Sequence, residues 1–128
     1  KNKIKYLKNK KEKKQNIKNN TLDNFVLKNK KLFEKKIDYI KIDTEGNDLK
    51  VLIGASKTIL KHKPKLIQIE MNYHYLFSGE NLYQFSKLLK GYEVYQIMPF
   101  NNGLLKIDPS RPENNIFHLS NFIFKKKN

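Results

Sequence analysis

The chain has 128 residues and a mass of 15.3 kDa, which is room for one domain of ordinary size. It contains no cysteine, so disulfides, thiolate nucleophiles and cysteine-held metal centres are excluded. No apolar run approaches the roughly 18 residues that a membrane-spanning helix needs. The hydrophobic content of 38% argues against a wholly disordered chain.

Lysines concentrate at the two ends of the chain, whose formal net charge is +15. Residues 1–20 hold nine lysines, and three more lie in the tail 125–128. We expect residues 1–20 to be a basic, largely solvated segment and 125–128 a basic tail, with the domain between them over 21–124. Direct reading of bases favours the planar fork of arginine, and Arg111 is the only arginine. We therefore expect no specific nucleic-acid partner, and a bias of the gene towards A/T-rich codons accounts for the excess of lysine.

The first half of this domain predicts a helix and then a strand–helix–strand unit. Thr21 can cap a helix over 22–35, which carries an imperfect apolar stripe. The run 37–43 (IDYIKID) predicts a strand, 48–62 a helix that a proline stops, and 65–71 (KLIQIEM) a second strand. A βαβ unit of this kind has parallel strands and a right-handed crossover. The apolar positions of its helix are Leu49, Leu52, Ile53 and Leu60.

The second half predicts one more helix and the remaining strands. These elements are a helix over 80–90 with Gly91 as its left-handed end, a strand over 92–98, a short strand or loop edge over 104–108, a loop over 108–115 and a last strand over 116–124. One face of the helix carries Leu82, Phe85 and Leu89. We expect the last strand to pair antiparallel with the strand over 92–98.

Three carboxylates and a histidine should gather at one edge of the sheet. Asp43 and Glu45 follow the first strand, and Glu70 lies near the end of the second, followed by Asn72 and His74. Ligands of open α/β sheets bind outside the carboxyl ends of the strands, and parallel strands bring those ends to the same edge. A general base needs a carboxylate or an imidazole within about 3 Å of the proton it removes. The pattern predicts a site here, with Asp43, Glu45, Glu70 and His74 as candidate catalytic residues.

A purely structural role also fits these acidic residues. Carboxylates before a helix satisfy its free amide groups and its dipole, so Asp43, Glu45 and Asp48 could simply be helix-start residues. A surface position beside two tyrosines is the alternative for His74. No two of the three histidines have the spacing of metal ligands, and no metal site is expected.

Several short motifs follow one another along the chain. They are TLD at residues 21–23, IKIDTEG at 40–46, VLIGA at 51–55, and KP at 63–64 before a strand that ends in Glu70. This order resembles the FkbM family of S-adenosylmethionine-dependent methyltransferases over about residues 17–98. The resemblance implies that 37–43 and 65–71 are the fourth and fifth strands of the methyltransferase sheet. It makes 92–98 and 116–124 the antiparallel sixth and seventh.

The fold implied by the resemblance is α/β: the C-terminal half of a Rossmann-like class I methyltransferase fold, with parallel strands, an antiparallel C-terminal strand pair and flanking helices. Such enzymes hold the cofactor with a glycine-rich turn after the first strand, and the five glycines here form no GxG pair. We therefore expect 21–124 to be a partial domain, with the cofactor-holding half upstream and the isolated chain inactive. The strand over 37–43 would then be an edge that exposes Ile40 and Ile42.

The function implied by the resemblance is methyl transfer from S-adenosylmethionine to a hydroxyl of a sugar or other metabolite. Asp43, Thr44 and Glu45 are the candidate cofactor-binding residues. The expected partner is a small-molecule or glycan acceptor, with no membrane partner and a cytoplasmic location. The alternatives are a non-catalytic basic module that binds nucleic acid or another polyanion through its lysine-rich ends, and an inactive fragment.

Overall fold

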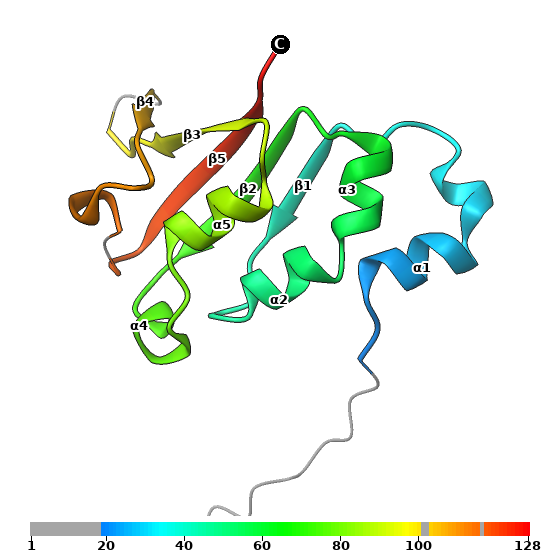
Figure 1. The fold of residues 1–128 in the computed structure, drawn as a ribbon, viewed down its shortest axis with the longest axis horizontal. Coiled ribbons are helices and arrows are strands. Elements are labelled where there is room, and N and C mark those ends of the chain that lie inside the picture. Colours follow the sequence, from blue (N-terminus) through cyan, green and yellow to red (C-terminus); the bar gives the residue numbers. More distant parts are fainter. Residues whose placement is uncertain (1–18, 101–102, 116) are drawn as a thin grey trace, which may run out of the picture.

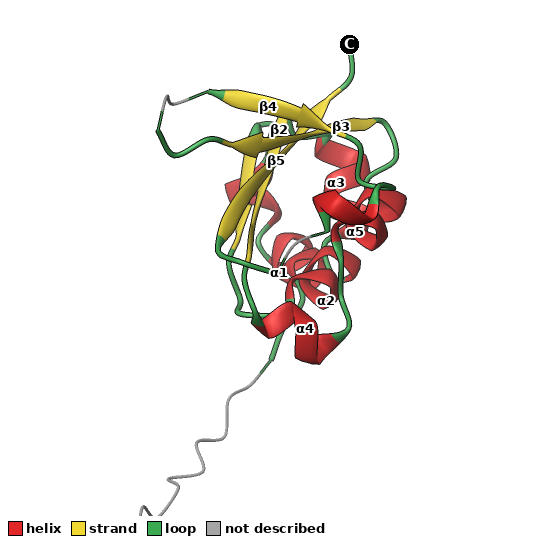
Figure 2. Cartoon of the chain, turned by 90° about the vertical axis from the view of Figure 1, so that its left-hand side faces the viewer, coloured by secondary structure: helices red, strands yellow, loops and turns green. Residues whose placement is uncertain are grey.

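Five strands form one mixed sheet that is covered by helices on one face (Figure 1, Figure 2). The computed structural model describes residues 19–100, 103–115 and 117–128. Apart from residues 19 and 20, the predicted basic segment 1–20 lies outside them. The strand order is β1-β2-β5-β3-β4. The elements are those of the α/β fold expected from the resemblance, a mixed sheet with parallel and antiparallel strands and flanking helices.

The strands confirm the expected pairing of the sheet. They are β1 (Tyr39–Ile42), β2 (Leu66–Met71), β3 (Tyr92–Ile97), β4 (Leu104–Ile107) and β5 (Ser120–Lys126). β1 and β2 are parallel, whereas β5 lies between β2 and β3 and is antiparallel to both. β4 pairs antiparallel with β3, so the short strand expected over 104–108 is present.

The last strand is shifted towards the C-terminus relative to its prediction. It begins at Ser120 instead of at position 116, which lies outside the described residues, and it continues to Lys126. Lys125 pairs with Leu66 of β2 and Lys126 pairs with Tyr92 of β3. Part of the basic tail that we placed after the domain therefore belongs to the sheet, because its backbone completes the ladders on both sides.

β1 is an edge strand among the described residues, as expected, but its apolar side chains are better covered than predicted. Ile42 is 3% exposed and belongs to the core, and Ile40 is half-buried against that core. The side chains of β1 alternate between the two faces of the sheet, so the isoleucines turn towards the helices. The exposed side chains of the strand are instead Tyr39 and Lys41.

The helices are shorter and more numerous than predicted. They are α1 (Leu22–Lys28), α2 (Asp48–Ile53), α3 (Ser56–His62), α4 (His74–Ser78) and α5 (Leu82–Leu88), with 3-10 turns η1 (Lys30–Phe33) and η2 (Pro112–Asn114). The helix expected over 22–35 ends at Asn29, whose backbone and side-chain amides both donate to the carbonyl of Phe25. α4 is not predicted from the sequence. α5 begins after Asn81, which forms a reciprocal capping box with Gln84, and Gly91 has the expected left-handed backbone with φ +90°.

The helix predicted over 48–62 is divided into α2 and α3 at Gly54. The backbone amide of Asp23 donates to the Gly54 carbonyl at 3.0 Å, so the start of α1 docks against the break. A Cβ at Gly54 would lie 3.0 Å from the side-chain methyl of Thr21, and glycine alone leaves room for this approach. The first of the short motifs therefore packs against the third.

Asp23 supplies the N-terminal cap of α3 from a distant part of the chain. Its Oδ1 accepts hydrogen bonds from the backbone amide of Thr58 at 2.7 Å and from the Thr58 hydroxyl at 2.6 Å. Its Oδ2 accepts the amide of Lys57 at 3.0 Å. Although Asp23 lies in the first turn of α1, its carboxylate caps α3. Although burial opposes the charged form, the bonds from Thr58 and Lys57 lower the pKa of Asp23.

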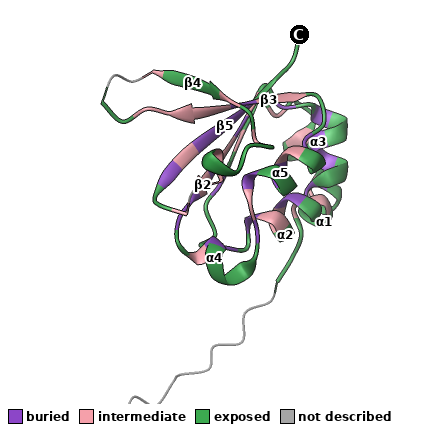
Figure 3. Cartoon of the chain, turned by 60° about the vertical axis from the view of Figure 1, so that its left-hand side comes forward, coloured by how far each residue is buried: buried purple, intermediate pink, exposed green. Residues whose placement is uncertain are grey.

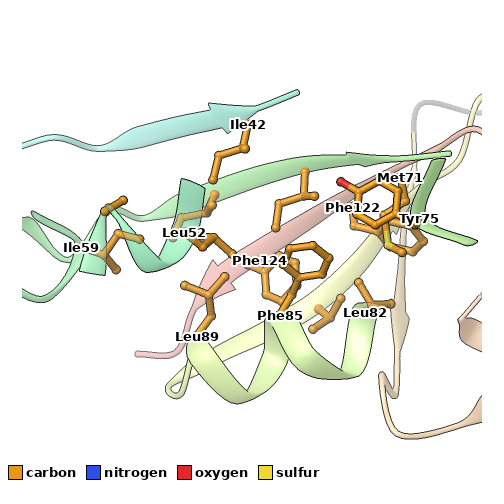
Figure 4. Packing of buried hydrophobic residues seen from close by; sticks show 14 residues of the cluster. Ile42, Leu52, Ile59, Met71, Tyr75, Leu82, Phe85, Leu89, Phe122 and Phe124 are labelled. Atoms are coloured by element: carbon orange, nitrogen blue, oxygen red, sulfur yellow. The ribbon is translucent and has the colours of Figure 1, made fainter. Parts of the chain in front are cut away.

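The core lies between the sheet and the helices (Figure 3, Figure 4). The predicted face of α5 is correct, since Leu82, Phe85 and Leu89 are all buried. Of the four apolar positions predicted for the divided helix, Leu52 is buried and Leu49 is half-buried, while Ile53 and Leu60 are 56% and 73% exposed. The break at Gly54 falls between Ile53 and Leu60, so a single helical period does not run through both, and in α3 it is Ile59 that is buried.

Asp23→Asn should destabilise the fold by about 1–2 kcal/mol at neutral pH, because a charged acceptor of three hydrogen bonds is lost. A carboxylate whose pKa is lower in the folded chain stabilises above its unfolded pKa of about 3.9, and this contribution disappears as the pH falls through the folded value. Urea unfolding at neutral and acidic pH measures both effects. Asp38→Asn, which breaks only an exposed ion pair with Lys65, should cost less than about 0.5 kcal/mol. Equal losses in the two variants would contradict the capping role.

Candidate functional site

The turn between β1 and α2 has a strained backbone that turns its side chains towards β2. Glu45 has φ +54° and Gly46 has φ +91°, so two successive residues are left-handed. For Glu45 this conformation costs roughly 1–2 kcal/mol relative to a right-handed one. The turn is held by Asp48, whose Oδ1 accepts the backbone amide of Thr44 at 2.8 Å and the Thr44 hydroxyl at 2.5 Å. Asp48 therefore has the structural role that we left open for it.

Asp43, Glu45 and Glu70 come together as predicted, and we call these three residues the acidic rim. One carboxylate oxygen from each lies within 4.8 Å of the other two. Asp43 and Glu45 are exposed, with 36% and 59% of their side chains accessible. Lys41, two residues before Asp43 on the same face of β1, places its Nζ 3.0 Å from Asp43 Oδ2, and this hydrogen bond raises the pKa of Lys41. Carboxylates in this arrangement could hold a cation, and Lys41 supplies a positive charge to one of them.

Glu45 joins the acidic rim to His74. Its Oε2 accepts a hydrogen bond from Asn72 Nδ2 at 2.5 Å and lies 2.9 Å from His74 Nδ1. The backbone amide of His74 donates to Asn72 Oδ1 at 2.9 Å, which fixes the start of α4. An ionised carboxylate only accepts, so His74 Nδ1 is the donor in this contact, and in the neutral imidazole the lone pair is then on Nε2. His74 is thus partly exposed, as the alternative of a surface position expected, and it also has a specific carboxylate partner in Glu45.

Gly46 permits this arrangement through its missing side chain. A Cβ on Gly46 would lie 3.1 Å from His74 Cβ and 3.4 Å from the carbonyl carbon and oxygen of His74. The turn and the start of α4 are therefore in backbone contact. This contact brings Glu45 within reach of His74, although the two residues are far apart in the sequence.

Two buried carboxylates lie beneath the turn: Asp48 is the first residue of α2, and Glu80 contacts the start of that helix. Asp48 is fully buried and its Oδ2 has no hydrogen-bond partner among the described residues. Glu80 is 6% exposed, and its Oε2 accepts the backbone amide of Leu49 at 3.1 Å. Burial raises the pKa of both groups, and the charge of Asp48 adds to the shift at Glu80. Sequence reasoning missed Glu80 because its partner is 31 residues away.

The candidate cofactor-binding residues lie on two sides of the turn. Thr44 lines a polar cavity of about 600 Å³ together with Asn47 and the residues before α1. Asp43 and Glu45 are not among its lining residues and face the acidic rim instead. Sequence reasoning also missed Lys41, although the alternation of side chains along a strand places it on the same face as Asp43.

Comparison with known proteins gives the class of the chain. A family model described as the methyltransferase FkbM domain matches residues 2–94. The match covers most of the chain and includes β1, β2 and the acidic rim, so the chain belongs to the FkbM methyltransferase family. No curated protein and no solved structure matches it. Across the described part of the chain, every helix is too short or too polar to span a bilayer.

Gly46→Ala should destabilise the protein by about 1–3 kcal/mol, because alanine adds backbone strain and its Cβ collides with His74. Gly91→Ala is the matched control, since Gly91 has φ +90° and open space around its Cβ position. The difference between the two urea unfolding free energies isolates the contact with His74. The side-chain amide signal of Asn72 in ¹H–¹⁵N spectra should shift only in Gly46→Ala. Equal destabilisation with no spectral difference would show that the close approach does not hold the site.

Glu80→Gln should stabilise the protein at neutral pH by about 0.5–2 kcal/mol, the usual range of stabilising substitutions. Glutamine still accepts the Leu49 amide and removes a charge that burial disfavours. A carboxylate whose pKa is raised by folding costs stability while it is charged, so the gain should shrink as the pH falls through that pKa and the native group becomes neutral. Thermal unfolding across pH measures this, with the exposed Glu34→Gln as the control. A loss of stability in Glu80→Gln at neutral pH would contradict the assignment.

Proposed function

We propose that the protein uses S-adenosylmethionine to methylate a hydroxyl oxygen of a sugar or similar metabolite at the acidic rim. Membership of the FkbM family supports methyl transfer, and the cofactor and acceptor class follow from the resemblance of the motifs. The observation that carries the assignment to this rim is the contact of 2.9 Å between Glu45 and His74 beside two further carboxylates. It combines a candidate proton acceptor with groups that bind hydroxyls.

The rim has the chemistry that this cofactor requires. S-adenosylmethionine carries an ammonium group and ribose hydroxyls, from which ionised carboxylates accept strong hydrogen bonds, and a sulfonium whose positive charge carboxylates attract. Asp43 and Glu45 would hold these groups at the end of β1, with Thr44 at the border of the adjacent polar cavity. When bound, the cofactor supplies a methyl group to the acceptor oxygen.

The residues of the chain would act on the acceptor. Glu45 holds His74 through Nδ1, so the lone pair on Nε2 can take the proton of the acceptor hydroxyl. Glu70 and Asp43 can accept hydrogen bonds from neighbouring hydroxyls and fix the orientation of the acceptor, and alignment of this kind supplies much of the rate in transfer reactions. Asn72, which is buried and bonded to both Glu45 and His74, is a positioning residue.

His74→Gln should lower the rate of methyl transfer about 10²- to 10⁴-fold, the range of a lost general base, without changing the unfolding midpoint. The assay follows transfer of isotope-labelled methyl from S-adenosylmethionine to monosaccharides and polyols by the full-length protein. His118→Gln is the matched control, because His118 is exposed and lies outside the helices and strands. A His74→Gln variant with the native rate would remove the base from this site. Absence of labelled product with every acceptor in the native protein would overturn the proposed function itself.

A further inference from the structure

A second concave site lies on the helical face of the sheet, at the end opposite to the acidic rim. It is a groove of about 350 Å³ between α3 and the end of α5, within the range of small-ligand sites of about 300–1,000 Å³. Leu52, Ile59 and Leu89 are buried lining residues (Figure 4). Ile53, Leu60 and Leu88 also line it and are 56%, 73% and 48% exposed. Large apolar side chains that gather around a concavity mark a binding surface.

Three lysines border this groove. Lys63 follows α3, Lys90 follows α5, and Lys126 ends β5. All three are exposed, and within the described residues none of them forms an ion pair with a carboxylate. The site therefore combines an apolar interior with a positively charged border, and we call it the lysine-bordered groove.

Lys63 occupies a position that favours glycine. It is the C-cap of α3 with φ +47°, and Glu45 of the rim is the other non-glycine residue with positive φ among those described. A left-handed lysine costs roughly 1–2 kcal/mol that glycine would not. A strained residue of this kind is a reason to look for a function of its side chain.

We propose that the lysine-bordered groove binds a single-chain anionic amphiphile, of which a fatty-acid carboxylate is the simplest form. The alkyl chain lies among Leu52, Ile59 and Leu89, and the carboxylate lies against Lys63, Lys90 and Lys126. Both parts of the ligand match the site, because the lining is mostly apolar, with Ser56 and Tyr92 as its uncharged polar side chains, and the three lysines at its border attract an anion. The groove is separated from the acidic rim by the length of the strands, so this ligand is neither the acceptor nor the methyl donor.

The direct test is calorimetric titration of the native chain with octanoate, decanoate and dodecanoate below their aggregation concentrations. We expect one site per chain and an affinity that rises with chain length, by up to about fourfold for each methylene that becomes buried. Nonyltrimethylammonium, which has the same alkyl chain as decanoate and the opposite charge, should bind at least 10-fold more weakly. Equal affinity for the two head groups would overturn the proposal.

Variants separate the ligand contact from folding. Lys63→Gly should weaken decanoate binding 3- to 10-fold while leaving the unfolding midpoint unchanged or higher, because glycine relieves the left-handed backbone. Lys87→Gln removes a charge from the same side of α5 without touching the groove, since Lys87 lies over the ring of Tyr83, and should bind as the native chain does. Leu60→Gln should reduce the dependence on chain length. Native affinity in Lys63→Gly would contradict the lysine contact.

Sedimentation experiments test two other occupants of the groove, a lipid surface and a second copy of the chain. Sedimentation with vesicles of an anionic phospholipid, without binding of monomeric decanoate, would mean that this face meets a lipid surface, and it would overturn the single-chain proposal. A dimer in sedimentation equilibrium that decanoate does not dissociate would mean that a second copy covers the groove, and it would overturn the proposal too.

Discussion

The close approach of Gly46 to His74 is the constraint on which the candidate site depends. The turn after β1 and the start of α4 belong to different parts of the chain, and they meet only because Gly46 has no side chain. The left-handed backbone of Glu45 then turns a carboxylate towards Asn72 and His74. The strain in this turn is offset by bonds that lie beneath it, chiefly the acceptance of both Thr44 donors by Asp48. The candidate catalytic groups of this chain are therefore aligned by backbone packing and a strained turn together.

The sequence predicts the sheet well and the helices less well. Strand positions follow from local β-rich runs and from punctuation by glycine and proline, which is why the parallel pair and the antiparallel C-terminal strand are correct. The break at Gly54 is caused by α1, which lies outside the segment whose periodicity predicted one long helix. The five-residue α4 is too short to show a period and is fixed by the side-chain oxygen of Asn72.

In the candidate site too, local signals and strand order could be read from the sequence, whereas tertiary contacts could not. Asp43, Glu45, Glu70 and His74 could be brought together from the sequence, because parallel strands have their carboxyl ends at one edge. The partners that set the properties of these groups could not be predicted. Glu80 reaches Leu49 and Asp23 reaches Thr58 only through the tertiary fold, so the sequence showed these acids without their roles.

The position of β5 has a consequence for how the chain folds. This strand comes last in the sequence but lies in the interior of the sheet, where it joins β2 to β3. Leu66 pairs with Lys125, so the central ladder closes a loop that spans nearly half of the chain. Contacts of such long sequence separation form slowly. During synthesis on the ribosome, β2 and β3 must therefore wait with unpaired edges until the final strand has left the exit tunnel, and this nascent state is the one most exposed to aggregation.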